Sequence, residues 1–181
     1  DATRNDGAEP IGWTRRVIDA SFAGAHSVRA GDIDGDGRAD IVATGTPANQ
    51  IAWWRNEGGD PIAWTRRTLA SAFFGGRSVR LGDIDGDGDL DVVGGNFDAR
   101  VAWWSNPGTI TGSWPSQLVT AALGQAHQVQ LADMNGDGRL DVLVAGYGGN
   151  VAAWFENGGL PAPIAWTRRN VDTLLPRPLA I

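Results

Sequence analysis

The 181-residue sequence contains no cysteine. This absence excludes a disulfide framework and a zinc–thiolate site, but it does not place the protein inside a cell, because a fold can be held together without disulfides. No run of about 18 apolar residues occurs, so the sequence predicts no membrane-spanning helix. The chain shows no signal peptide at Asp1, which is typical of a mature or trimmed start.

Residue patterns that carry catalysis are scarce as well. The sequence has two isolated histidines, no GxSxG motif and no glycine-rich loop leading into a helix, so we expect no enzymatic activity from this chain. The formal net charge of −6 argues against nucleic acid as a partner. One methionine and one tyrosine stand beside nine tryptophans and 26 glycines, a balance typical of short aromatic strands joined by tight turns.

The sequence does contain a unit that recurs about every 50 residues. Its most distinctive part is an aspartate-rich loop, which reads DIDGDGRAD at residues 32–40, DIDGDGDLD at 83–91 and DMNGDGRLD at 133–141. The motif WTRR recurs with the same unit, starting at residues 13, 64 and 166. A period of this length indicates a propeller, a solenoid or an array.

The spacing within the middle loop predicts a calcium site. Its positions 1, 3, 5 and 9 are Asp83, Asp85, Asp87 and Asp91, and glycines at positions 4 and 6 permit the positive φ angles of a tight turn. Carboxylates this close repel one another by several kcal/mol at intermediate dielectric unless a cation lies between them. Ca²⁺ takes about six to eight oxygen ligands, so the backbone carbonyl at position 7 and a water complete the expected shell.

Two alternatives to this calcium loop are a helical EF-hand and a polar turn without metal. An EF-hand needs a bidentate glutamate at loop position 12, where this sequence has Gly94, and helical flanks, where it has short β-branched segments. A metal-free turn is disfavoured by the presence of three copies. We therefore predict three Ca²⁺ sites, each in a loop between two strands.

The predicted ligands are side chains at positions 1, 3, 5 and 9 and backbone carbonyls at position 7. They are Asp32, Asp34, Asp36, Arg38 and Asp40; Asp83, Asp85, Asp87, Asp89 and Asp91; and Asp133, Asn135, Asp137, Arg139 and Asp141. Three Ca²⁺ ions would cancel the net charge of −6, so we attribute the acidity to the metal sites. The third loop has Asn135 in place of an aspartate and is predicted to bind Ca²⁺ most weakly.

Between the loops, alternating apolar and polar residues predict short strands and no helix. Four strands per repeat, expected in the first at residues 27–31, 39–44, 50–55 and 62–69, correspond to one propeller blade of antiparallel strands. A lone strand is expected at residues 11–18, and an edge segment with two prolines at 174–181. The predicted organisation is an N-terminal arm at residues 1–10 and one partial all-β propeller at 11–181, with repeats at about 20–70, 71–121 and 122–172.

The pattern FxGAxSVxxGDIDGDGxxDIV, followed by IAWWxNxG and WTRR, resembles the FG-GAP or VCBS repeat, and the likeness extends from Ile11 to Asp172. This repeat forms the blades of integrin-α-like propellers and of many secreted bacterial proteins. The resemblance therefore implies a seven-bladed, calcium-binding propeller that is secreted or at the cell surface. Three blades and one strand cannot close a ring of roughly four to eight blades. We expect a homo-oligomer or a larger propeller, in which another copy or further sequence completes six or seven blades.

Adjacent tryptophans, Trp53–Trp54 and Trp103–Trp104, must point to opposite faces of their strands. Aligning IAWW at residue 51 with VAAW at residue 151 sets Trp53 against Ala153. This alignment predicts that the second tryptophan of each pair is structural and that the first is available to a ligand. Trp53 and Trp103 are accordingly predicted to be platforms on which a sugar ring stacks. The alternative is that both members of each pair lie in the core between blades.

A polar residue stands just before the first strand of each repeat: His26, Arg77 and His127. The exchange of histidine for arginine disfavours a metal site, so these residues are predicted to be rim residues or ligand contacts at the propeller mouth. Two functions stay open, a calcium-stabilised module that binds carbohydrate and a non-catalytic scaffold or adhesion segment. An exposed first tryptophan favours carbohydrate binding, and a buried pair favours the scaffold.

Overall fold

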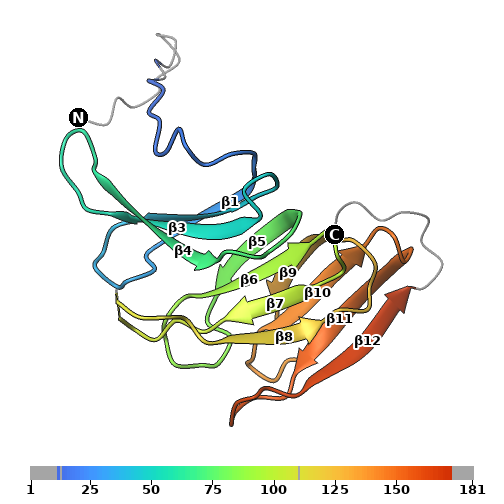
Figure 1. The fold of residues 1–181 in the computed structure, drawn as a ribbon. Helices are drawn as coiled ribbons and strands as arrows, with labels where there is room; N and C mark the ends of the chain where they lie inside the picture. Colours follow the sequence, from blue (N-terminus) through green and yellow to red (C-terminus); the bar gives the residue numbers. More distant parts are fainter. Residues whose placement is uncertain (1–11, 13, 110, 173–181) are drawn as a thin grey trace.

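The structure is a computed structural model that describes residues 12, 14–109 and 111–172. These residues form twelve strands in three four-stranded antiparallel sheets (Figure 1), which confirms the predicted all-β class and four-stranded blades. Blade 1 contains β1 (Ala25–Gly31), β2 (Asp40–Gly45), β3 (Gln50–Asn56) and β4 (Trp64–Ala70). Blade 2 contains β5 (Gly76–Gly82), β6 (Asp91–Asn96), β7 (Val101–Trp104) and β8 (Ser116–Thr120). Blade 3 contains β9 (Ala126–Ala132), β10 (Asp141–Gly146), β11 (Val151–Asn157) and β12 (Trp166–Asp172).

The strands predicted in the first repeat correspond to β1–β4, with ends shifted by at most two residues. The strand predicted at residues 11–18 is wrong in its described part, because residues 14–18 form no strand. A strand needs a hydrogen-bonding neighbour, and the described sheets provide none for this segment. The arm predicted at residues 1–10 and the edge segment predicted at 174–181 lie outside the described residues. No described residue belongs to a helix with the length and apolar character needed to cross a membrane.

The three blades lie side by side in chain order, with β5 next to both β1 and β9 (Figure 1). Within each blade the strand order follows the chain, so the first strand is innermost and the fourth is outermost. This is the arrangement of successive blades around a propeller axis.

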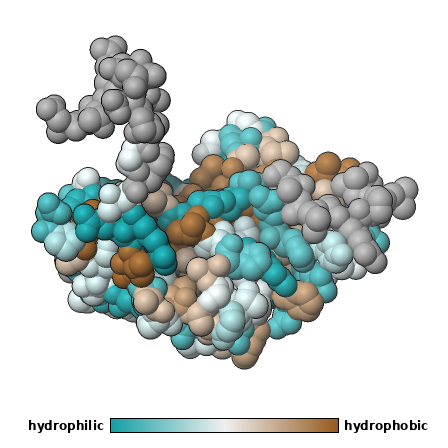
Figure 2. Space-filling view, turned by 90° about the horizontal axis from the view of Figure 1, so that it is seen from above, coloured by the Kyte–Doolittle hydropathy of each residue, from teal (hydrophilic) through white to brown (hydrophobic). Residues whose placement is uncertain are grey.

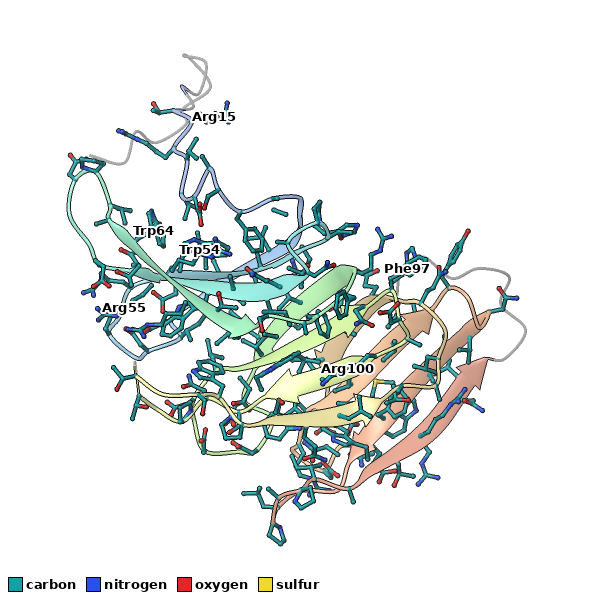
Figure 3. All side chains as sticks on the ribbon, in the orientation of Figure 1. Arg15, Trp54, Arg55, Trp64, Phe97 and Arg100 are labelled. Carbon is teal, nitrogen blue, oxygen red and sulfur yellow. The ribbon has the colours of Figure 1, made fainter. Side chains whose placement is uncertain are left out.

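Each blade has two faces, and the pairing register assigns residues to them because directly opposed residues on antiparallel strands share a face. In blade 1, Val42 pairs with Trp53 on the face turned toward blade 2, which we call the forward face. Ile41 pairs with Trp54 on the opposite face, which we call the rear face. Figure 3 shows Trp54 on the side of the first sheet that points away from β5.

The hydrophobic core lies between the blades, where a forward face packs on the rear face of the next blade. The first interface joins Val42, Ile51 and Trp53 of blade 1 to Val79, Val92 and Trp104 of blade 2. The second joins Val93, Val101 and Trp103 of blade 2 to Val129, Val142 and Phe155 of blade 3. The described blades are thus held together by one kind of interface, used twice.

Two hydrogen bonds recur at both interfaces. A serine on the inner strand accepts the backbone N–H of a valine in the next blade, Ser27 from Val79 and Ser78 from Val129, each at 3.2 Å. An asparagine at the end of the third strand, or just after it, donates to a loop carbonyl of the preceding blade, Asn106 to Ile33 at 2.7 Å and Asn157 to Ile84 at 2.8 Å. These bonds fix the register between neighbouring blades.

Both tryptophans of each pair are buried, so the prediction that Trp53 and Trp103 are available to a ligand is wrong. Their exposed fractions are 1% and 4%. The physical reason is that the next blade covers the forward face on which they lie. An indole buried to this extent has no face left for a sugar ring.

The alignment of Trp53 with Ala153 is also wrong. Val42 and Leu143 each stand two residues after the last aspartate of their loop, and they pair with Trp53 and Trp154 respectively. Trp154 is therefore the counterpart of Trp53. The turn between β6 and β7 is one residue shorter than the corresponding turns, so a constant offset of 50 residues fails in the third repeat.

Replacing Trp53 or Trp103 by alanine is expected to lower the free energy of unfolding by about 3–5 kcal/mol, the cost of truncating a buried tryptophan. Phe74 is 55% exposed, and the control Phe74→Ala should stay within about 0.5 kcal/mol of the parent. Urea unfolding followed by circular dichroism measures all three variants. An unchanged unfolding free energy in Trp53→Ala would contradict the buried placement.

Candidate functional site

Each aspartate-rich loop joins the first and second strands of its blade. Gly86 and Gly88 of the middle loop have φ angles of 80° and 95°, as the sequence predicted, and the corresponding glycines of the other loops are also in the left-handed region. All three loops therefore have the backbone turn that the calcium-site prediction required.

The first aspartate of each loop accepts hydrogen bonds from the loop's own backbone. Asp83 Oδ1 accepts the N–H groups of Gly86 at 2.7 Å and Asp87 at 3.1 Å, and its Oδ2 accepts that of Gly88 at 3.1 Å. Asp133 makes the same three contacts, and these bonds, that from Gly138 above all, hold its pKa below the ordinary value. The loop backbone thus favours a charged carboxylate at position 1.

The last aspartate of each loop is completely buried. Asp91 Oδ2 accepts the N–H of Ile84 at 2.9 Å, and its Oδ1 accepts the N–H of Asn106, just beyond β7, at 2.7 Å. Asp40 and Asp141 make the corresponding pairs of bonds. Burial raises the pKa of Asp91 to about 7, although both hydrogen bonds favour the charged form. Each of these carboxylates ties its loop to the third strand, and a nearby cation would remove the cost of keeping it ionised.

Carboxylates at positions 1, 3 and 9 converge in two of the loops. Their oxygens lie within 4.8 Å of one another in the groups Asp32, Asp34, Asp40 and Asp83, Asp85, Asp91. Asp85 Oδ1 is buried without a hydrogen-bond partner, and burial raises the pKa of this carboxyl. An all-oxygen set with one unpaired buried oxygen fits a hard divalent cation such as Ca²⁺. The position 5 carboxylates, Asp36 and Asp87, lie outside both groups.

The third loop differs because Asn135 stands at position 3. Its Nδ2 donates to Asp137 Oδ2 at 2.8 Å and to Glu156 Oε1 at 3.4 Å. Glu156, from β11, therefore brings a carboxylate close to position 3 of this loop. The other oxygen of Glu156 accepts from Arg169 at 2.9 Å.

One residue outside the loops faces position 3 in every blade, and sequence reasoning missed it. It is the residue before the recurring asparagine of the third strand: Arg55, Ser105 or Glu156. Arg55 forms ion pairs with Asp34 and Asp36, whereas Ser105 Oγ donates to Asp85 Oδ2 at 3.0 Å. The signal available in the sequence is a change of charge, from positive to neutral to negative, at one fixed position of an otherwise regular motif.

This variable residue changes the charge balance of the three loops. Arg55 places a cation on two predicted ligands of the first loop, where it competes with Ca²⁺. The middle loop has a neutral hydroxyl at that point, and the third has an additional carboxylate. We therefore expect Arg55 to weaken Ca²⁺ binding at the first loop, and the weakest binding by the loop with Asn135 stays a prediction.

The arginines at position 7 contact the end of the third strand. Arg38 Nε donates to the carbonyl of Asn56 at 2.8 Å, and Arg139 Nε donates to that of Asn157 at 2.9 Å. Each guanidinium also pairs with the position 5 aspartate of its own loop. The expected roles of the carbonyls of Arg38, Asp89 and Arg139 as Ca²⁺ ligands stay predictions.

His26, Arg77 and His127 lie near the starts of the inner strands, at the end opposite the loops. His26 Nδ1 is 3.0 Å from the carbonyl oxygen of Arg77, and its Nε2 is 2.8 Å from Arg77 Nη1. The Arg77 guanidinium lies over Phe97, which Figure 3 shows far from Arg55 and its loop. His127 stacks on Tyr147, and burial, helped by the charges of Arg77 and His26, lowers its pKa. His26 and Arg77 thus contact each other and His127 contacts Tyr147, whereas Trp53 and Trp103 are buried between the blades.

Comparison with known families adds one finding. A family model described as an FG-GAP-like repeat matches residues 32–94 and 87–144. Together the two matches cover more than half of the chain and include all three aspartate-rich loops. A comparison with curated proteins gives no match.

Exchanging the variable third-strand residue should exchange the Ca²⁺ affinities of two loops. Unit charges about 4 Å apart interact by roughly 1–4 kcal/mol near a protein surface. Arg55→Ser is therefore expected to raise the Ca²⁺ affinity of the first loop about tenfold or more. Ser105→Arg should weaken the middle loop by a similar factor. Calorimetric titration with Ca²⁺ measures both changes.

Arg168→Ser is the control for this exchange, because it removes the same charge from an exposed site on β12, where Arg168 contacts Asn170. Its Ca²⁺ affinities should equal those of the parent. Equal shifts in Arg55→Ser and Arg168→Ser would mean that only net charge matters, and would contradict the local role assigned to Arg55.

Proposed function

Because the chain belongs to the FG-GAP-like repeat family, we propose that it is a calcium-bound scaffold of β-propeller blades, with a structural or adhesion role and no catalysis of its own. Repeats of this family are generally non-catalytic structural or adhesion modules. They occur in extracellular or surface proteins, and the proposal includes such a location. Extracellular modules bind Ca²⁺ with dissociation constants of about 10⁻⁴ to 10⁻³ M, a range that suits small exposed loops.

The observation that carries the calcium proposal is the group formed by Asp83, Asp85 and Asp91. Three carboxylates meet there, one of them completely buried and one with an oxygen that lacks a partner. Like charges at this spacing destabilise the folded state unless protons or a cation neutralise them. Ca²⁺ is preferred over Mg²⁺ because it accepts irregular sets of about six to eight oxygens, whereas Mg²⁺ demands a near-ideal octahedron.

The residues around the loop give the cation a structural task. Asp91 connects the metal-binding loop to Asn106, and Asn106 donates in turn to the carbonyl of Ile33 in the loop of blade 1. Asn157 repeats this link from blade 3 to Ile84 in the loop of blade 2. An ion that fixes one loop therefore also fixes the contact of that loop with the next blade. This continuity supports a scaffold whose blades are held in one geometry by Ca²⁺.

Carbohydrate binding through Trp53 and Trp103 is not part of the proposal. Both indoles lie in the core between blades, with exposed fractions of 1% and 4%. The polar residues His26 and Arg77 contact each other and lie away from these indoles. A buried pair of tryptophans is what the scaffold alternative requires.

Removal of Ca²⁺ is expected to lower the melting temperature markedly. Each site stabilises the native state by RT ln(1 + [L]/Kd), which is about 2.7 kcal/mol at a hundredfold excess of ligand over Kd. Three sites together contribute about 8 kcal/mol, which is more than half of the stability of an ordinary domain, about 5–15 kcal/mol. Thermal unfolding by circular dichroism, in excess Ca²⁺ and after addition of EGTA, measures the effect.

Two controls make this experiment specific. EGTA already loaded with Ca²⁺ should leave the melting temperature unchanged, and Mg²⁺ should restore little of what chelation removes. An Asp34→Asn, Asp85→Asn variant should respond less to EGTA than the parent. A melting temperature that is identical with and without EGTA would overturn the calcium proposal.

A further inference from the structure

On the two outer faces of the three-blade stack, some positions are exposed whose counterparts within the stack are buried. Val28, on the rear face of blade 1, is 55% exposed, whereas the equivalent Val79 and Val129 are 0% exposed. Met134, in the loop of blade 3, is 43% exposed, whereas the equivalent Ile33 and Ile84 are 2% exposed. Each of these side chains stands where the other blades contact a neighbour.

The rear face of blade 1 is apolar and hollowed. A cavity of about 270 Å³ lies on it, lined by Val28, Ile41, Ala43 and Trp54 together with residues that precede β1. Figure 2 looks onto this side of the molecule and shows hydrophobic surface there. In blade 2 the position of Ala43 is occupied by Gly94, and a Cβ on Gly94 would come within 2.8 Å of Ile51 of blade 1. A neighbouring blade therefore fills this space at the first interface.

The residue sizes at the internal interfaces follow a rule. In the blade that contributes its forward face, the inner strand ends in a glycine. Two leucines of the next blade occupy the space beside this glycine. A Cβ on Gly31 would lie 3.0 Å from Leu81 and 2.9 Å from Leu90. A Cβ on Gly82 would lie 2.8 Å from both Leu131 and Leu140. A methyl group at the glycine position is incompatible with the two leucines.

The two open faces break this rule in complementary ways. The position of Gly31 and Gly82 is Ala132 in blade 3, so two leucines of a following blade would clash with its methyl group. The positions of the two leucines are Ala30 and Ala39 in blade 1, which leave room for that methyl group. The forward face of blade 3 is thus unsuited to a blade of the internal type, and it suits the rear face of blade 1.

We propose that this chain assembles head to tail with a second copy of itself, the forward face of blade 3 packing on the rear face of blade 1 of the other copy. Two copies make two such contacts and supply six blades, within the roughly four to eight of closed propellers. The groups that form hydrogen bonds across the internal interfaces have equivalents at the proposed contact between copies. Asn56, equivalent to Asn106 and Asn157, donates to the carbonyl of Met134 of the second copy, which corresponds to Ile33 and Ile84.

The assembly is tested by the molar mass of the Ca²⁺-loaded chain, measured by light scattering after size exclusion. The expected mass is twice 19.1 kDa over the micromolar range. Ala132→Leu should reduce it to 19.1 kDa, because the enlarged side chain meets blade 1 of the second copy. Ala72→Leu, at an exposed site outside both faces, is the matched control and should keep the doubled mass.

A rescue experiment separates a specific interface from misfolding. The variant Ala30→Leu, Ala39→Leu gives blade 1 the leucines of an internal blade, and it should be monomeric because it meets Ala132. Adding Ala132→Gly restores the internal glycine–leucine combination and should restore the doubled mass. Circular dichroism checks that every variant keeps its β structure.

Three results would overturn the proposal. One is a mass of 19.1 kDa for the parent chain at all concentrations. Another is a mass that keeps growing with concentration, which would indicate an open head-to-tail chain and not a closed pair. The third is a doubled mass that persists in Ala132→Leu and in Ala30→Leu, Ala39→Leu, since the alanines would then not lie in the contact. The proposal does not rest on the scaffold function, and chelation of Ca²⁺ tests that function separately.

Discussion

The buried aspartate at the end of each loop is the constraint on which the rest of the structure depends. Asp40, Asp91 and Asp141 are completely buried, and each accepts one N–H from its own loop and one from the end of the third strand. The loop, the second strand and the third strand of a blade are thereby joined at one carboxylate. Burial raises the pKa of Asp91 and so opposes its charge, and a cation held by the other carboxylates of the loop, as the calcium proposal requires, would offset this cost.

A contact that recurs between neighbouring blades links each buried aspartate to the preceding blade. The asparagine that donates its N–H to the buried aspartate also reaches the loop of the preceding blade through its side-chain amide. Apolar side chains of the forward and rear faces then complete the contact, among them the tryptophans that alternate across the third strand. The aspartate-rich loops, strand pairing and blade packing are therefore parts of one connected arrangement.

Departures from the repeat are as informative as the repeat itself. The residue that faces loop position 3 changes from Arg55 to Ser105 to Glu156, so three loops of similar sequence differ in electrostatics. On the outer faces, Ala132 replaces the glycine of the internal contacts, and Ala30 replaces the leucine. A few side chains thus distinguish the outer blades from the middle one without altering the strands.

The sequence by itself determined the strands, the blades and the loops with their predicted ligands, because these depend on spacing within a few residues. Alternation of side chains predicts a strand, and the aspartates of residues 83–91 with their glycines predict a turn in which oxygens converge. Only the tertiary structure decided which face of each strand is covered, and therefore that Trp53 is core. It also decided that Arg55 and Glu156 reach the loops. These facts arise from pairing register and from contacts between blades, which join residues far apart in the chain, so no local pattern contains them.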